Sequence, residues 1–449
     1  MPLTSWSYRA ALRLGVALVP VIGLVDPKLG EGHRHRRRAA DRLAWWASSH
    51  RDYGRPLVWF HAASVGEGRQ AESVLDELRR QVPACQIVYT HFSPSAEPLA
   101  RRLPVDVADY LPYDAPSTVE RVLDALAPDL LVFAKLDLWP ELASRADGRG
   151  TGVALVAATV SPGSGRLRWP ARELLRPGYA AVTVAGAISE ADAARLATLG
   201  VPRPRIRVTG DPRFDSVAAR VAAIEPGDPL LGLGVGGATL VAGSTWGADD
   251  RVLLPAFASI LERHPTARLI VVPHEPTADH LSALDRRAAA LRLPAPVRLS
   301  ATTGAVPLLV VDRVGALATL YGAGTMAYVG GGFGRAGLHS VLEPAAWGVP
   351  VCFGPRWRES RDAALLLEGG GGTALRPGEP AAVTSLVETW EQWLTDKAYR
   401  EAQGGRAGAI VAEGQGAARR SAEMLAELIS SRPPRTSRFA APAARPSAR

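Results

Sequence analysis

The chain alternates between short apolar segments and longer amphipathic ones, in two separate sets. Apolar runs of four to eight residues indicate strands, and the segments between them have the spacing of helices. The first set of expected strands is Leu57 to His61, Gln86 to Thr90, Asp129 to Ala134, Gly152 to Ala157 and Ala181 to Ile188. The second set is Thr239 to Ala242, Ala267 to Val272, Leu308 to Val311, Met326 to Val329 and Val349 to Phe353. Strands that alternate with helices form parallel sheets, so we expect an α/β fold of two doubly wound, Rossmann-like domains facing a cleft.

The length of 449 residues exceeds what one hydrophobic core usually supports, which also favours two domains. The Pro/Gly-containing stretch near Pro226 reads as a linker, and a long helical stretch is expected from Thr384 to about Ser430. The predicted division is an N-terminal segment 1–42, a first domain 43–215, a linker 216–230, a second domain 231–430 and a disordered basic tail 431–449.

The net charge of +8 belongs to the two ends of the chain. Residues 1–42 hold eight Lys/Arg against three acidic residues, and the last eighteen residues hold five Arg and no acid. The body has no basic stripe with interleaved aromatic residues, so we expect no nucleic acid as partner. The two cysteines, Cys85 and Cys352, lie far apart in apolar runs, which predicts neither a disulfide framework nor a metal site.

A run of apolar residues from Leu14 to Val25 precedes a cluster of arginines at positions 34, 36, 37, 38 and 42. The run is shorter than the roughly 20 residues that a bilayer span needs. We therefore favour an interfacial anchor with arginines on anionic headgroups of a membrane surface. The alternative is a buried N-terminal helix with a solvated basic flank.

The stretch from Tyr328 to Pro355 has the pattern strand, glycine-rich turn, short helix, strand. In such a unit the glycines let backbone N–H groups approach a phosphate, and the helix dipole adds partial positive charge there. Glu343 follows the loop at a distance where its carboxylate can accept hydrogen bonds from the hydroxyls of a ribose. These features favour a nucleotide-binding site over a flexible turn between core strands.

The turn after the first strand, His61 to Gly68, ends a strand and opens a helix. Glu67 would then lie at the carboxyl edge of the sheet, where a carboxylate can act as a general base for an attacking hydroxyl. The alternative is that Glu67 only complements the dipole of the helix that it begins. Spacing alone does not separate these two interpretations.

Several short motifs occur in the order found in one enzyme family. They are His61-x-x-Ser64-x-Gly66-Glu67, Tyr110-Leu-Pro-Tyr113-Asp114, Leu138-Trp139-Pro140, Gly210-Asp-Pro-Arg213-Phe214-Asp215, Gly243-Ser244-Thr245-Trp246, Pro273-His274-Glu275 and His339-Ser340-Val-Leu-Glu343-Pro344. Over roughly residues 8–425 the chain resembles the 3-deoxy-D-manno-octulosonic acid (Kdo) transferases.

The resemblance implies a GT-B glycosyltransferase at the cytoplasmic face of a bacterial inner membrane. Such enzymes transfer Kdo from CMP-Kdo to a lipid A precursor in lipopolysaccharide biosynthesis, with inversion and without an obligatory metal or other cofactor. Glu67 matches the general base of the family. The positions implied in substrate or donor binding are Ser64, Gly66, Arg213, Ser244, Thr245, His274, Glu275, Gly337, His339, Ser340 and Glu343.

The chain departs from the family pattern in the first domain. Where the family has an acidic, threonine, acidic run, this chain has Lys135-Leu136-Asp137, and Ala157 to Ser161 lacks the amide and guanidinium of the family's corresponding run. Two alternatives follow: a GT-B transferase with another nucleotide sugar or membrane acceptor, and a non-catalytic relative that binds nucleotide or lipid.

Overall fold

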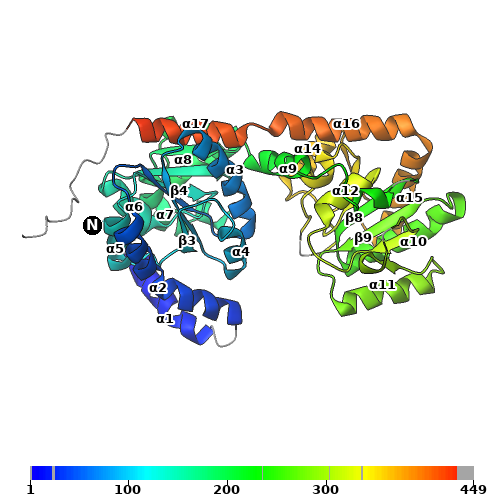
Figure 1. Ribbon diagram of the computed structural model, residues 1–449, viewed down its shortest axis with the longest axis horizontal. Coiled ribbons are helices and arrows are strands. Elements are labelled where there is room, and N and C mark those ends of the chain that lie inside the picture. Colours follow the sequence, from blue (N-terminus) through cyan, green and yellow to red (C-terminus); the bar gives the residue numbers. More distant parts are fainter. Residues whose placement is uncertain (1–2, 23–25, 235, 303, 335–336, 432–449) are drawn as a thin grey trace, which may run out of the picture. The chain divides into compact units, whose positions relative to one another are not determined.

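The structure is a computed structural model that describes residues 3–22, 26–234, 236–302, 304–334 and 337–431. It divides into two compact units. Unit 1 comprises Met1–Ser216 together with Gly416–Arg449, and unit 2 comprises Val217–Gln415 (Figure 1). Each unit contains one parallel sheet with helices, which confirms the predicted α/β class. The predicted disordered tail lies outside the described residues from residue 432 onward.

Unit 1 is built on a seven-stranded parallel sheet in the order β3-β2-β1-β4-β5-β6-β7. Its strands are β1 Leu57–His61, β2 Gln86–His91, β3 Val107–Tyr110, β4 Leu130–Ala134, β5 Gly152–Ala158, β6 Val184–Ala187 and β7 Ile206–Val208. Successive strands extend from β1 in one direction and from β4 in the other, so the chain order reverses between these two neighbours. In open α/β sheets, ligands bind outside the carboxyl ends of the strands at such a switch point.

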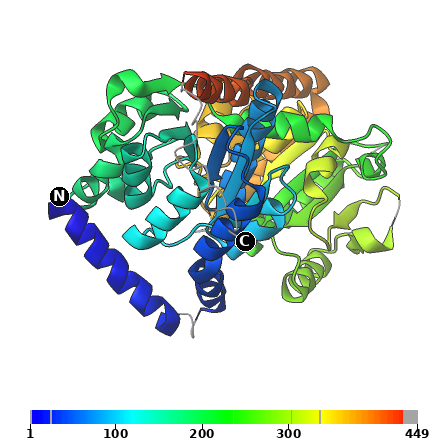
Figure 2. The ribbon, with the colours of Figure 1, turned by 60° about the vertical axis from the view of Figure 1, so that its left-hand side comes forward.

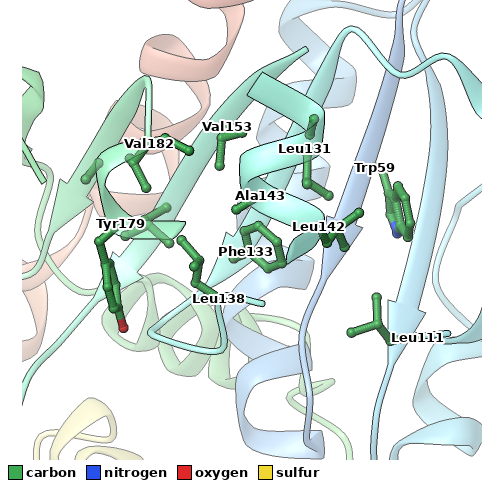
Figure 3. Packing of buried hydrophobic residues seen from close by; sticks show 14 of the residues in the cluster. Trp59, Leu111, Leu131, Phe133, Leu138, Leu142, Ala143, Val153, Tyr179 and Val182 are labelled. Carbon is green, nitrogen blue, oxygen red and sulfur yellow. The ribbon is translucent and has the colours of Figure 1, made fainter. Parts of the chain in front are cut away.

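The central strands β1, β4 and β5 of unit 1 are buried on both faces, as continuous apolar sequences in parallel sheets require. Figure 3 shows one face, where Phe133 of β4 packs near Leu142 of helix α6 and Trp59 of β1 lies beyond it. The opposite face carries Val58 and Phe60 of β1, because successive side chains of a strand alternate between faces. The two cores fix the strands that carry the functional loops.

The helices of unit 1 surround this sheet (Figure 1). They are α1 Leu3–Ile22, α2 Pro27–His50, α3 Val65–Gln81, α4 Glu97–Ala100, α5 Pro116–Leu126, α6 Pro140–Gly148, α7 Ala171–Ala180, α8 Glu190–Leu199 and α17 Ala417–Ser430. Helix α9, Pro212–Ala222, begins in unit 1 and ends in unit 2. Figure 2 shows α1 as a straight helix along the outside of unit 1, with the N-terminus of the chain at its start.

Unit 2 has a second seven-stranded parallel sheet, in the order β10-β11-β9-β8-β12-β13-β14. Its strands are β8 Thr239–Thr245, β9 Arg268–Pro273, β10 Val297–Arg298, β11 Leu308–Val310, β12 Met326–Val329, β13 Val351–Phe353 and β14 Gly372–Ala374. Its helices are α10 Gly247–Arg263, α11 Ala278–Ala290, α12 Leu317–Ala323, α13 Leu342–Ala346, α14 Arg361–Glu368, α15 Glu379–Thr395 and α16 Lys397–Gly414. Here the switch point lies between β8 and β12.

The end of the chain differs from the prediction. The helical stretch after Thr384 consists of three helices, and the last one, α17, belongs to unit 1 rather than to the second domain. Asp215 accepts hydrogen bonds from the N–H groups of Gly416 (2.6 Å) and Ala418 (3.0 Å), and Leu425 is buried in the same core as Val58. An amphipathic pattern shows that one face of a helix is buried but does not identify the sheet that buries it.

Two other predicted boundaries fall inside helices. The linker predicted at 216–230 begins within α9, which continues to Ala222. The boundary at residue 42 cuts α2, whose side chains Ala39, Ala40, Leu43 and Trp46 are all buried. The part of α2 around Ala39 and Ala40 is therefore in the core of unit 1, so residues 1–42 are not a detachable membrane segment.

Candidate active site

Glu67 lies at the switch point of unit 1, in the first turn of α3 directly after β1. The N-cap residue Ser64 accepts a hydrogen bond from the Glu67 N–H at 3.4 Å, and a Glu67 carboxylate oxygen accepts one from the Ala63 N–H at 3.0 Å. The Ser64 bond is the first half of a capping box, whereas Glu67 reaches one residue beyond the N-cap, to the N–H of Ala63 and not that of Ser64. The half-buried carboxylate is thus held at the carboxyl edge of the sheet, where the sequence predicted it.

Gly68 packs directly against Tyr89 of β2. A Cβ atom at position 68 would lie 2.9 Å from the Tyr89 hydroxyl and 2.7 Å from Leu99, so the helix needs a glycine here. Burial, followed by the charges of Glu67 and Glu72, raises the pKa of Tyr89, which therefore keeps its proton. A Cβ atom at position 66, by contrast, would have no described neighbour within 4 Å, so packing does not require a glycine there. The predicted role of Gly66 in substrate binding stays a prediction.

His61 at the end of β1 is fully buried and lies between two neighbouring strands. Its Nδ1 is 3.0 Å from the Thr90 carbonyl oxygen, and its Nε2 is 2.8 Å from a carboxylate oxygen of Asp137. Burial alone would raise the pKa of Asp137, but the hydrogen bonds from His61 and Trp139 and the charge of Arg166 outweigh it and lower that pKa. His61 therefore positions an ionised Asp137 after β4.

Arg213 in α9 forms an ion pair within its own turn. Its Nε and Nη2 donate to one oxygen of Asp211 at 2.9 and 2.6 Å, and its backbone N–H donates to the other oxygen at 3.0 Å. Asp211 is buried, which makes this a well-fixed pair. The predicted contact of Arg213 with a donor phosphate or carboxylate stays a prediction.

In unit 2 the glycine-rich loop after β12 packs tightly against the end of β8. A Cβ atom at Gly330 would collide with the Ser244 carbonyl oxygen, and Gly331 adopts the left-handed conformation at φ +91°. Ser244 is itself left-handed at φ +52°, a conformation that is rare for a residue with a side chain. Such backbone strain is concentrated at ligand-binding sites.

Asp249, in the first turn of α10, holds this loop in place by hydrogen bonds. This role was not predicted from the sequence. Its carboxylate accepts hydrogen bonds from the Tyr328 hydroxyl at 2.6 Å, the Trp246 N–H at 2.8 Å and the Gly331 N–H at 3.1 Å. Burial raises the pKa of Asp249, although these hydrogen bonds oppose that effect. Asp249 lies three residues after the N-cap Trp246, at the position of a capping residue, and this spacing could have identified it from the sequence.

Three rings stack beside the loop: those of Trp246, His274 and His339. The ring centroids of His274 lie 4.8 Å from Trp246 and 4.3 Å from His339. Trp246 Nε1 donates to His339 Nε2 at 3.0 Å, so neutral His339 carries its proton on Nδ1. Burial, and then the neighbouring His274, lower the pKa of His339 to about 4.

The structure brings several predicted donor-site residues together around this stack. Ser244 and Thr245 end β8, His274 follows β9 with its N–H bonded to the Thr245 carbonyl oxygen at 2.9 Å, and the His339 N–H donates to the Gly330 carbonyl oxygen at 3.2 Å. Gly337 is left-handed at φ +83°, and Glu275 and Ser340 are exposed. The loops thus meet at the switch point of unit 2.

Glu343 lies in the first turn of α13 and forms an ion pair with Arg220 of α9. Both side chains are partly exposed. No local pattern predicts this arginine, because 123 positions separate the two residues. Any ribose that binds to Glu343 shares its carboxylate with Arg220.

A cavity of about 450 Å³ lies in unit 1 between α1, α6 and α7. Its lining includes Tyr8, Arg9, Glu141, Leu174 and Pro177. Within the described residues, His, Cys, Asp and Glu do not gather in any group of three or more that could hold a metal ion. None of the described helices combines the length and the apolar character that crossing a bilayer requires.

Two parallel α/β units with functional loops at their switch points define a GT-B fold. A solved glycosyltransferase from Rickettsia africae has this fold, with a TM-score of 0.58 at 10% identity over 85% of this chain and 100% of that one. A solved UDP-GlcNAc 2-epimerase from Neisseria meningitidis matches with a TM-score of 0.56 at 13% identity, over 80% of this chain and 99% of that one. The predicted fold class is thereby confirmed.

The family is shown by sequence relatives. A family model described as 3-deoxy-D-manno-octulosonic-acid transferase matches residues 37–216. A 3-deoxy-D-manno-octulosonic acid transferase from Bordetella pertussis is 31% identical over 390 residues, covering 83% of this chain and 87% of the relative. One from Haemophilus influenzae is 25% identical over 418 residues, covering 90% and 93%. The chain belongs to the Kdo transferase family, a family of glycosyltransferases, as its motifs predicted.

Proposed function

We propose that this protein transfers Kdo from CMP-Kdo to a hydroxyl of a lipid A precursor, with inversion at the anomeric carbon. Glu67 removes the proton from the acceptor hydroxyl, the resulting oxygen attacks the anomeric carbon, and the bond to the CMP phosphate breaks. A general base is needed because an alcohol is a weak nucleophile. The observation that carries this proposal is the fixed Glu67 carboxylate at the switch point of unit 1.

The donor binds in unit 2 in this proposal. CMP leaves with growing negative charge, and donors that are already fixed stabilise such charge without reorganisation. His339 is a donor of this kind, because its proton is confined to Nδ1 and its ring is held by Trp246. Gly330, Gly331 and Gly337 after β12 and the first turn of α13 complete the site, with Glu343 on the ribose.

The acceptor is a lipid, and α1 supplies a surface for contact with the membrane. The half-buried side chains of α1 recur every three to four residues, at Tyr8, Arg9, Leu12, Val16 and Val19. The other side exposes large apolar side chains: Trp6 at 73%, Leu14 at 64% and Leu18 at 47%. An apolar face of this kind lies in the interface plane of a membrane.

The basic part of α2 divides between two roles. Arg34, Arg37 and Arg38 are exposed and can contact anionic headgroups, in keeping with the predicted inner-membrane partner. Arg36 is buried, and Arg42 pairs with Asp109, so these two belong to the fold. We place the enzyme at the cytoplasmic face of the inner membrane on the basis of its proposed lipid acceptor and this surface.

The test is incubation of the full chain with CMP-Kdo and a tetraacylated lipid A precursor. Release of CMP together with the mass gain of one or more Kdo residues on the lipid supports the proposal. Transfer from another nucleotide sugar, with none from CMP-Kdo, would assign a different donor. Tight CMP binding without turnover would instead indicate a non-catalytic relative.

A further inference from the structure

Two polar side chains near the start of α1 join this helix to the rest of unit 1. The Tyr8 hydroxyl donates to a carboxylate oxygen of Asp114 at 2.7 Å. The Arg9 guanidinium donates from Nε and Nη2 to the two oxygens of Glu141, at 2.9 and 2.8 Å. Both carboxylates are buried, with Asp114 1% exposed and Glu141 6% exposed. Burial raises the pKa of Tyr8, so its hydroxyl remains a donor.

The remainder of α1 packs loosely against unit 1. Of residues 6–19, whose side chains the structure describes, none is fully buried. The cavity of about 450 Å³ between α1, α6 and α7 is lined in part by Tyr8, Arg9 and Glu141, so packing beside the two contacts is incomplete. In proteins most of the stability of a helix comes from burial of its apolar face. The position of α1 on unit 1 therefore depends strongly on the two polar contacts.

The same two carboxylates belong to the first turn of α6 and its cap. Asp114 accepts hydrogen bonds from the N–H groups of Glu141 at 2.9 Å and Leu142 at 2.7 Å. The N-cap residue Trp139 makes no side-chain hydrogen bond to the helix, so Asp114 caps α6 from another segment. Glu141, the partner of Arg9, is the second residue of α6. A shift of α1 therefore acts directly on the start of α6.

The start of α6 lies next to the switch point of unit 1. The Trp139 indole N–H donates to a carboxylate oxygen of Asp137 at 3.4 Å, and His61 Nε2 is 2.8 Å from the same oxygen. His61 ends β1, and the turn after it leads to Glu67 in the first turn of α3. Contacts thus run without a break from α1, through the start of α6, to the strand that precedes the proposed general base.

We propose that Tyr8 and Arg9 are positioning residues through which an anionic lipid surface raises the turnover of the enzyme. This inference rests on the proposed function and on the membrane contact proposed for α1. A lipid surface that covers Trp6, Leu14 and Leu18 binds the side of α1 opposite to the two contacts, and it binds that side only while the helix is formed. The surface therefore stabilises α1 in its docked position. The docked helix holds the start of α6, and with it the switch point, in the arrangement that transfer requires.

The test uses an acceptor that stays in solution. Vesicles cannot concentrate a deacylated, phosphorylated glucosamine disaccharide by insertion, so any effect of lipid on its turnover acts through the protein. Transfer from CMP-Kdo to this sugar is measured for the full chain with and without vesicles of anionic lipid. Tyr8→Phe removes the hydroxyl and Arg9→Gln removes the guanidinium. The matched control is Tyr53→Phe, which removes an exposed hydroxyl that donates to the Ala125 carbonyl oxygen. Thermal unfolding and vesicle flotation check every variant.

The expected result is stimulation by lipid that depends on the two contacts. In wild type and Tyr53→Phe, vesicles raise kcat about tenfold, the usual effect of a hydrogen bond to a charged group. Tyr8→Phe and Arg9→Gln lose most of this stimulation but still float with the vesicles and bind CMP as wild type does. A merely structural role would lower kcat equally with and without vesicles. That result, stimulation that survives both substitutions, no stimulation of wild type, or loss of flotation in Tyr8→Phe would overturn the proposal.

Hydrogen exchange separates this inference from the proposed reaction, because it needs neither donor nor turnover. In wild type, vesicles should slow exchange of the Glu141 and Leu142 N–H groups about tenfold, and in Tyr8→Phe they should not. If no form of the chain transfers Kdo but this protection is present, the positioning role stands and the reaction assignment fails. If transfer proceeds but vesicles change neither this exchange nor kcat, the positioning role is wrong and the reaction stands.

Discussion

Arg220 of α9 and Glu343 of α13 form an ion pair, although 123 positions separate them along the chain. The pair links the segment that enters unit 2 to the helix that follows the glycine-rich loop. It also gives Glu343 a structural role beside the proposed contact with ribose. Substitutions at the two positions can separate these roles.

We expect Glu343→Ala to weaken CMP binding about tenfold or more, because a carboxylate that accepts hydrogen bonds from a ligand contributes roughly 1.5–3 kcal/mol. Arg220→Ala leaves the carboxylate in place and should change CMP affinity much less. Titration calorimetry with CMP measures both. Equal losses in the two variants would mean that Glu343 acts only through its ion pair.

The pH dependence of stability reports on His339. Its pKa in the folded protein is about 4, whereas a histidine in the unfolded chain titrates near 6.5. Below about pH 6.5 the unfolded state therefore takes up a proton that the folded state does not, so this contribution to stability is lost as pH falls from about 6.5 toward 4.

The matched variant is His339→Gln, whose side-chain oxygen can still accept from Trp246 Nε1. We expect the Tm of wild type to fall more steeply than that of His339→Gln between pH 6.5 and 4. Differential scanning calorimetry across this range gives the comparison. Parallel curves would show that the ring is protonated in the folded state and does not accept the Trp246 hydrogen bond.

A third prediction concerns the exposed face of α1. Replacing Trp6, Leu14 and Leu18 together by serine should reduce binding to vesicles with anionic lipids at least tenfold, because about 1 kcal/mol or more of apolar transfer is lost per side chain. These side chains are exposed, so Tm should change little. Vesicle flotation measures the effect. A variant that floats as well as wild type would place the membrane contact elsewhere.

Deletion of residues 1–42 is not a suitable version of that experiment. It would remove Arg36, Ala39 and Ala40, which are buried in unit 1. We expect this truncation to lose cooperative unfolding, in contrast to the triple serine variant. A truncated chain with the Tm of wild type would contradict the role of α2 in the core.

The strand pattern was predictable where strands are long and buried. Strands β1, β4 and β5 are continuous apolar runs buried on both faces, and the sequence located each within one or two residues. The four edge strands β3, β7, β10 and β14 were missed, because most of their residues are partly exposed and they lack the continuous apolar run of a buried strand. The buried face of α2 was also not predicted, because the cluster of arginines interrupts its apolar pattern.

The site was predictable where a local motif defines it. The spacing of Ser64 and Glu67 predicts the cap at the start of α3, and the glycines after β12 predict the loop. Arg220 beside Glu343 and His61 beside Asp137 came only from the structure, because each contact joins segments that are distant in the sequence. The fold brings such groups together, and no pattern within one segment encodes them. Asp249 differs, because its position three residues after the N-cap of α10 is a local signal.

The measurement that tests the central claim most directly is the turnover of Glu67→Gln. Glutamine can still accept the hydrogen bond from the Ala63 N–H, so the start of α3 is kept, but it cannot take a proton from the acceptor. We predict that kcat for Kdo transfer falls about 100-fold or more while CMP affinity and Tm stay close to those of wild type. If Glu67→Gln keeps more than roughly a tenth of wild-type turnover, Glu67 only caps α3 and is not the general base.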